Sequence, residues 1–138
     1  MNYKIILPFL AATVFLQHAH VPGFFQDGYL YAAFGKNAAE LGHWLIPYLT
    51  QSTYPEFTHH TPFVFILEGL FFKVFGASYL SARIFTSLFG FGTLFLLYKL
   101  LKGKKYIYLS LFLFILIPHL MKKMRSPSLD PALMMCVL

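Results

Sequence analysis

The chain has 138 residues, of which 58% are hydrophobic, 20% are aromatic and only 12% are charged. Soluble domains carry about 25% charged residues, and a chain of this size buries only roughly two-thirds of its surface on folding, so the composition predicts residence in lipid. The formal net charge of +6 would also suit a nucleic-acid binder. Such proteins are far less hydrophobic, and no nucleic-acid partner is expected.

The N-terminal segment starts with Lys4 and continues as an apolar run from Ile5 to Leu16. A basic start before a short apolar run is also typical of a secretory signal peptide. The residues that follow, QHAHVPGFF, contain no convincing small-x-small cleavage site. We therefore predict an uncleaved first transmembrane helix over 4–20.

An outward loop is predicted over 21–78, with two helices at the membrane interface. The first, 29–46, mixes aromatic with charged and polar side chains, as interfacial helices do. The second, 62–75, would be only ~21 Å long, against ~30 Å of hydrocarbon in a bilayer. It also carries Glu68 at its centre. We expect this helix to lie along the interface or to dip into it.

Further transmembrane helices are predicted at 79–101 and 106–121, and another begins near Leu129. If 62–75 does not span, Lys4 and the lysines at 99–105 share one face, which the positive-inside rule makes cytoplasmic. The loop 21–78 and the turn 122–128 then face outward together, although the basic residues of that turn argue against this. The predicted fold class is all-α, with polytopic transmembrane helices and interfacial helices in the first outward loop. Because the chain stops within an apolar segment, we expect it to be the front of a longer protein.

Two acids stand just before predicted helices. Asp27 follows a proline-glycine turn, and Asp130 lies in SPSLDPAL, so each could be an ordinary helix N-cap. As a general base, Asp27 would need a substrate hydroxyl within hydrogen-bond reach. The predicted topology places both acids on one membrane face, where a carboxylate could take a proton while cations hold a phosphate. The cations available on this face are Arg83, Lys122, Lys123 and Arg125.

The side chains of Glu56, His59 and His60 have the chemistry of metal ligands. Prolines on both sides make regular helical spacing doubtful there, so no metal site is predicted. The single cysteine, Cys136, excludes an internal disulfide and a cysteine-built metal site.

The order of the motifs resembles a known family of membrane enzymes. The first predicted span is followed by QDGYLYAAFGKNAAELGHWLIPY and then by YPEFTHHTPFVFILEGLFFKVFGASYLSARIFTSLFG, a basic turn, another span and SPSLDPAL. This order is similar to the N-terminal third of GT-C membrane glycosyltransferases. The group it resembles most is that of dolichyl-phosphate-mannose protein mannosyltransferases and bacterial aminoarabinose transferases. The similarity runs over roughly residues 5–138, and its specificity lies in the order and spacing of short motifs.

The resemblance implies roles for particular residues. Asp27 matches the family's catalytic acid-base residue, while Gly28 stands where the family usually has Glu. His60-Thr61-Pro62 matches its Lys-Pro-Pro or His-Pro-Pro element, with Thr61 departing from the first proline, and implies that His60 contacts a lipid phosphate. Ala82-Arg83 and Asp130 match later motifs of the family.

We therefore expect part of an inverting glycosyltransferase that takes a sugar from a polyprenyl-phosphate-linked donor at the outer face of the inner or plasma membrane. Asp27 would deprotonate a hydroxyl of a glycan, protein or lipid acceptor. Asp130 would orient the acceptor or a divalent cation, the one cofactor left open. The departing phosphate would be stabilised by the basic side chains of His60, Arg83, Lys122, Lys123 and Arg125. Because the family's remaining spans are missing, this stretch alone is expected to be inactive.

Two other classes of function remain as alternatives. In the first, the chain is a small non-catalytic membrane subunit or scaffold, and its acids only cap helices. In the second, it is part of a transporter built around Glu68 as an intramembrane carboxylate.

Overall fold

The computed structural model describes residues 3–17, 19–24 and 27–138. Within these ranges the chain forms seven helices and no strand, which confirms the all-α prediction for this part of the chain. The helices are α1 (Tyr3–Leu16), α2 (Asp27–Leu41), α3 (Phe63–Phe75), α4 (Tyr79–Leu101), α5 (Ile107–Leu116), α6 (Pro118–Arg125) and α7 (Asp130–Val137).

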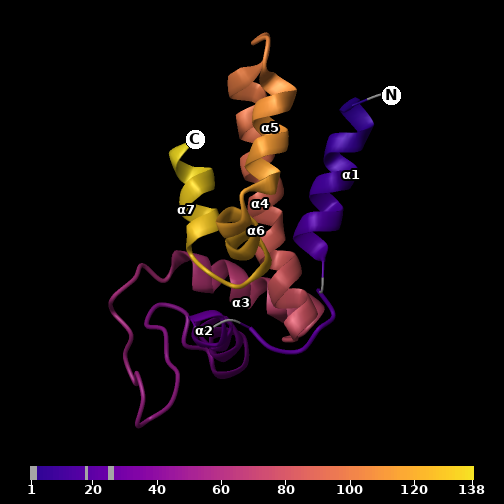
Figure 1. Ribbon diagram of the computed structural model, residues 1–138. Helices are drawn as coiled ribbons and strands as arrows, with labels where there is room; N and C mark the ends of the chain where they lie inside the picture. The colour runs from indigo at the N-terminus through magenta and orange to yellow at the C-terminus, as the bar shows by residue number, and fades with distance from the viewer. Residues whose placement is uncertain (1–2, 18, 25–26) are drawn as a thin grey trace.

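The helices form an upright group and a crosswise pair (Figure 1). In the upright group, α4 contacts α1, α5 and α7, and the short helix α6 lies across its lower half. The crosswise pair, α2 and α3, packs together below that group. The start of α1 and the α4–α5 turn lie at the upper end, whereas the 19–78 segment and the α6–α7 turn meet at the lower end.

Helix α4 coincides with the predicted segment 79–101. It begins with a capping box, in which Ser78 Oγ accepts from the Ser81 backbone N–H at 3.1 Å and Ser81 Oγ accepts from the Ser78 N–H at 2.9 Å. Its 23 residues correspond to a length of ~34 Å. In the described part of the chain, α4 is the one unbroken helix long and apolar enough to cross a membrane. A polytopic arrangement therefore stays a prediction.

The predicted segment 106–121 is not one straight helix. It divides at Ile117 into α5 and α6, whose axes are bent by 69°. The cause is Pro118, which has no backbone N–H and disfavours helical geometry in the residue before it. Ile117 accordingly has φ −67° and ψ 114°, in the extended region. The bend turns the basic residues of α6 toward the crosswise pair.

Other boundaries differ from the prediction by a few residues. Helix α1 ends at Leu16 instead of residue 20, which gives it a length of ~21 Å. Helix α2 spans 27–41 instead of 29–46, and it is followed by Gly42 at φ 80°, a left-handed conformation that glycine adopts without steric cost. Helices α3 and α7 begin one residue after the predicted starts at 62 and 129.

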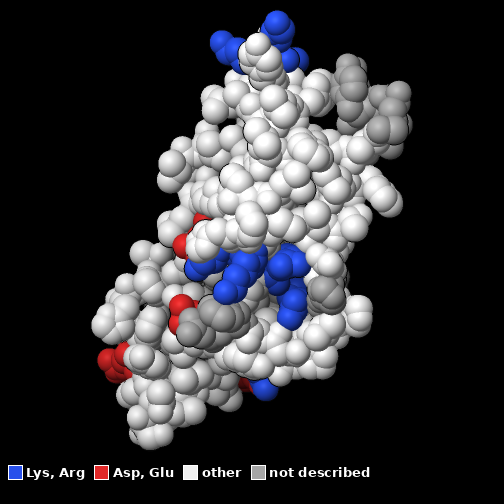
Figure 2. Space-filling model, viewed as in Figure 1, with Lys and Arg blue, Asp and Glu red and all other residues white. Residues whose placement is uncertain are grey.

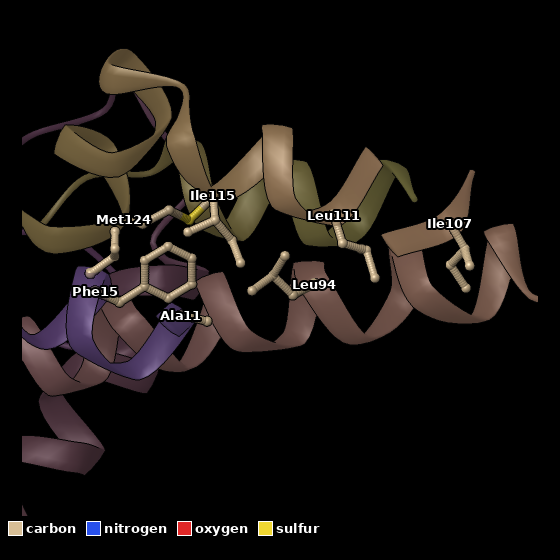
Figure 3. Packing of buried hydrophobic residues seen from close by; sticks show 8 residues of the cluster. Ala11, Phe15, Leu94, Ile107, Leu111, Ile115 and Met124 are labelled. Atoms are coloured by element: carbon tan, nitrogen blue, oxygen red, sulfur yellow. The ribbon is translucent and has the colours of Figure 1, made fainter. Parts of the chain in front are cut away.

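An apolar cluster joins α1, α4, α5 and α6 (Figure 3). Phe15 and Met124 are buried where these helices meet, and both approach Gly90 of α4. A Cβ atom on Gly90 would lie 3.0 Å from Met124 Sδ and 3.1 Å from the Phe15 ring. The small residue thus lets α1 and α6 pack directly on α4, and this contact places α6 beside the lower end of α4.

The α2–α3 pair crosses closely through two glycines. A Cβ atom on Gly69 would lie 3.0 Å from the Gly35 carbonyl oxygen, 3.0 Å from the Trp44 ring and 3.1 Å from Ala38 Cβ. Backbone lies on one side of this contact, so the neighbours cannot make room without moving a helix. The crossing fixes α2, which carries Asp27, relative to α3.

Replacement of Gly69 by alanine is expected to destabilise the protein. A methyl group in so tight a contact costs about 1–3 kcal/mol, which exceeds the gain of about 1 kcal/mol from the better helix propensity of alanine. We expect the melting temperature of the detergent-solubilised protein, followed by circular dichroism, to fall by several degrees.

Gly92→Ala is the matched control for this substitution. In α4, the three atoms nearest to a Cβ atom on Gly92 would all belong to the flexible Met135 side chain, with Sδ at 2.5 Å. Because Met135 can change rotamer, we expect no loss of stability. Equal melting temperatures for the two variants would contradict the close α2–α3 crossing.

Candidate functional site

Asp27 is the first residue of α2 and is exposed. Its neighbour Gly28 is buried where α2 begins against the α6–α7 turn. A Cβ atom on Gly28 would lie 2.8 Å from Ser126 Oγ and 3.3 Å from the Pro127 carbonyl oxygen. The glutamate that the similar family usually has at this position would not fit unless this contact opened. Gly28 therefore brings Asp27 beside the segment that leads to Asp130.

Asp130 is the first residue of α7 and pairs with a cation of α6. The distance from Lys123 Nζ to Asp130 Oδ2 is 2.7 Å. The N-cap residue of α7 is Leu129, so Asp130 does not have the ordinary N-cap role that its sequence position suggested. Because both side chains are partly exposed, we assign the pair only about 0–1 kcal/mol of stability. Its importance is geometric, since it holds one acid and one cation side by side.

His60 reaches the same region from the loop before α3. Its Nε2 atom lies 3.4 Å from the hydroxyl of Tyr31, with the two rings 6.0 Å apart. Burial raises the pKa of Tyr31, and the negative charges of Asp27 and Asp130 raise it further, while Lys123 acts in the opposite direction. The side chain of Tyr31 is therefore close enough to Asp27 and Asp130 for both negative charges to affect its pKa.

Tyr31 is a site residue that sequence reasoning missed. It follows Asp27 by four residues, so both lie on one face of α2. That spacing was the available signal, but it could not be separated from the aromatic side chains of an interfacial helix.

One cavity of about 360 Å³ gathers most of the predicted residues. We call it the acidic–basic cavity, and its predicted lining residues are Asp27, His60, Lys122, Lys123 and Asp130. They come from α2, the loop before α3, α6 and α7, four separate parts of the chain. Tyr31 and His119, which were not assigned to the site, also line it. Figure 2 shows basic side chains gathered at the junction of the upright and crosswise helices, with acidic side chains beside them.

Arg83 and Arg125 lie in a neighbouring hollow of about 400 Å³, which also includes Lys122. We call this hollow the basic pocket and define it by these three residues. Lys122 lines both spaces, so they adjoin. Arg125 Nη1 donates to Gln17 Oε1 at 3.1 Å, and its Nε donates to the Met121 carbonyl at 3.2 Å.

Arg83 is held in place by neighbours from the 19–24 segment. Its Nη2 atom donates to the Gly23 carbonyl, and its guanidinium carbon lies 5.6 Å from the centre of the Phe24 ring. Its Nε–H is buried and has no hydrogen-bond partner among the described residues. A buried donor beside two further cations favours an anion with several oxygens, such as a phosphate.

The residues weighed for a metal site do not gather. No group of three or more His, Cys, Asp or Glu side chains that could hold a metal ion occurs in the part of the chain that is described. His59 packs edge-on against Phe57, with the ring centres 5.4 Å apart. A divalent cation at Asp130 stays a prediction.

Glu68, the residue of the transporter alternative, lies outside both spaces. It is buried between α2 and α3, with only 3% of its surface exposed. Burial raises the pKa of its carboxyl group to about 8. Glu68 is therefore mostly neutral at pH 7 and does not add its charge to the acidic–basic cavity.

Comparisons of the chain with protein-family models, with curated proteins and with solved structures found no match. The resemblance to GT-C glycosyltransferases therefore stays a prediction that rests on the motifs and their order.

Proposed function

We propose that this chain contributes the donor-binding and base-bearing part of an inverting membrane glycosyltransferase that uses a polyprenyl-phosphate-linked sugar. The observation that carries the proposal is the meeting of Asp27, His60, Lys123 and Asp130 in one cavity that adjoins a pocket of three cations. A carboxylate beside a phosphate-binding pocket suits a reaction in which a hydroxyl loses a proton and a phosphate departs.

The proposed reaction is a single displacement at the anomeric carbon of the sugar. Asp27 takes the proton of the acceptor hydroxyl, and the hydroxyl oxygen forms the new bond to that carbon. The bond from the carbon to the phosphate oxygen breaks on the opposite side, and the electron pair leaves with the phosphate. Arg83, Lys122 and Arg125 stabilise the charge that develops there, usually the largest catalytic contribution in such reactions.

The proposal includes a multi-pass arrangement in the membrane, with the site facing outward. Helix α4 has the length and composition of a span, and the bent pair α5–α6 meets the same test when its two helices are taken together. The basic end at the α4–α5 turn would be cytoplasmic by the positive-inside rule. The crosswise pair α2–α3 would then lie at the outer interface, where a lipid-linked donor is within reach.

Binding of polyprenyl phosphate tests the donor half of the proposal. Each charge-assisted hydrogen bond contributes about 1.5–3 kcal/mol, so we expect Lys122→Gln and Arg125→Gln each to raise the Kd for polyprenyl phosphate at least tenfold. The affinity is measured in detergent by microscale thermophoresis with the purified protein.

Lys105→Gln is the control for these two variants. Lys105 is exposed in the α4–α5 turn, at the end of the upright helices that lies away from the basic pocket. Its Kd should equal that of the wild type. If Lys122→Gln and Arg125→Gln bind polyprenyl phosphate with the same Kd as Lys105→Gln and the wild type, the basic pocket does not hold the donor phosphate. The same conclusion follows if the wild type prefers polyprenol to polyprenyl phosphate.

A further inference from the structure

Glu68 is a buried acid that the proposed reaction does not use. On α3 it faces Gly35 of α2 so closely that a Cβ atom there would lie 2.8 Å from Glu68 Oε2. The other carboxyl oxygen, Oε1, is buried without a hydrogen-bond partner among the described residues. An unpaired polar atom in such surroundings costs about 1–3 kcal/mol, so its persistence needs an explanation.

Ser128 supplies a second buried oxygen of the same kind. Its Oγ atom is also buried and also has no partner in the described part of the chain. Glu68 and Ser128 line one small cavity of about 10 Å³. That is about the space that one water molecule requires when polar groups surround it. Thr86 lines the cavity as well, but its hydroxyl already donates to the Ala82 carbonyl at 3.1 Å.

The small cavity lies directly behind a wall of the acidic–basic cavity. Tyr31, Pro127, Ser128 and Leu129 line both spaces. The next residue after this wall is Asp130, which pairs with Lys123. A contact that fixes Ser128 therefore also fixes the position of the acid–cation pair.

We propose that Glu68 and Ser128 bind one water molecule between them, and that this bridge positions the 126–130 segment as the wall of the acidic–basic cavity. The water makes one hydrogen bond with each side chain, either as donor or as acceptor. Both buried oxygens then have a hydrogen-bond partner. A bridging water is nearly as favourable in enthalpy as a direct hydrogen bond. The inference goes beyond the proposed function, because it holds whether or not the protein transfers a sugar.

The surroundings of the bridge make it dependent on the neutral form of Glu68. Helix α2 presents Gly35 and Tyr31 to the carboxyl group, α4 presents Phe85 and Thr86, and the α6–α7 turn presents no charged side chain. Tyr31 is the one other titratable residue that lines this cavity within the described ranges, and it bears no positive charge. Ionisation of Glu68 would thus place an uncompensated charge against the bridge, and we expect it to loosen the 126–130 segment.

A double-mutant cycle tests the bridge directly. Ser128→Ala should lower the melting temperature of the detergent-solubilised protein by several degrees, but it should have little effect when Glu68 is already Leu. The same cycle with Thr86→Val is the matched control, because Thr86 lines the cavity but already has a partner, and its effect should be additive with Glu68→Leu. Additive effects for Ser128→Ala would overturn the proposal.

Hydrogen exchange measures the positioning role separately from overall stability. In Glu68→Leu and in Ser128→Ala, amides of the α6–α7 turn and the start of α7 should exchange at least tenfold faster, while those of α1 keep the wild-type rate. In the wild type, protection factors in this segment should fall between pH 7 and 9, and in Glu68→Gln they should not. Wild-type protection of this segment in Glu68→Leu and Ser128→Ala, or an equal loss of protection in α1, would refute the positioning role.

Discussion

Asp27→Asn is expected to slow sugar transfer by about 10²–10⁴-fold, the usual contribution of a positioned general base. Asparagine has nearly the same shape as aspartate but cannot take the acceptor proton. Because Asp27 is exposed at the first turn of α2 and does not line the basic pocket, the Kd for polyprenyl phosphate should change less than threefold. The measurement is single-turnover transfer from a radiolabelled polyprenyl-phosphate sugar in native membranes that contain the complete enzyme to which we propose that this chain contributes.

Glu56→Gln serves as the control for Asp27→Asn. Glu56 is an exposed acid in the loop before α3 and lines neither the acidic–basic cavity nor the basic pocket. The Glu56→Gln variant should transfer sugar at the wild-type rate. Wild-type transfer by Asp27→Asn would remove Asp27 from the mechanism, and a parallel loss of lipid binding would give it a structural role instead.

The stability of the protein should depend on pH through Glu68. Its pKa is about 8 in the folded protein, against the ordinary value of 4.5 that applies in the unfolded chain. Between these values the folded state retains a proton that the unfolded state has lost, so the free energy of unfolding falls as pH rises and levels off above about pH 8. Between pH 5 and pH 8 the titration of this one group lowers the free energy of unfolding by roughly 3–4 kcal/mol.

Glu68→Gln removes this dependence, because the amide is neutral at every pH. We expect the variant to match the wild type near pH 5 and to exceed its stability at pH 8, as measured by denaturant unfolding in detergent. Glu40→Gln is the control, since Glu40 is exposed and pairs with Lys36 at 3.8 Å. If the wild type and Glu68→Gln lose stability equally between pH 5 and pH 8, Glu68 is not neutral in the folded protein.

The sequence predicted the upright helices well where apolar runs have clear ends. Helix α4 agrees residue for residue because Ser78 caps its start and a lysine-glycine turn follows its end. The α5–α6 bend was missed because the apolar character continues past Pro118, and a proline within a long apolar run is compatible with a kinked helix or a full break.

The gathering of the site was predicted in part. Asp27, His60 and Asp130, which the sequence assigned to one site, do line one cavity. The separation of Arg83 and Arg125 into a neighbouring pocket could not be predicted, because the order of segments along the chain does not indicate which side chains line the same hollow. The roles of Gly28 and Gly35 as close-contact positions were likewise hidden, because a glycine in a helix does not indicate which distant residue approaches it.

Release of free polyprenyl phosphate from a panel of polyprenyl-phosphate-linked sugars is the most direct test of the account. The assay uses native membranes that contain the complete enzyme to which we propose that this chain contributes, and mass spectrometry follows the lipid. We predict release from at least one donor of the panel, with inversion at the anomeric carbon of the product, and release that is slower by about 10²–10⁴-fold for Asp27→Asn. No release from any donor, although the protein binds polyprenyl phosphate, would contradict sugar transfer and favour a non-catalytic lipid-binding role.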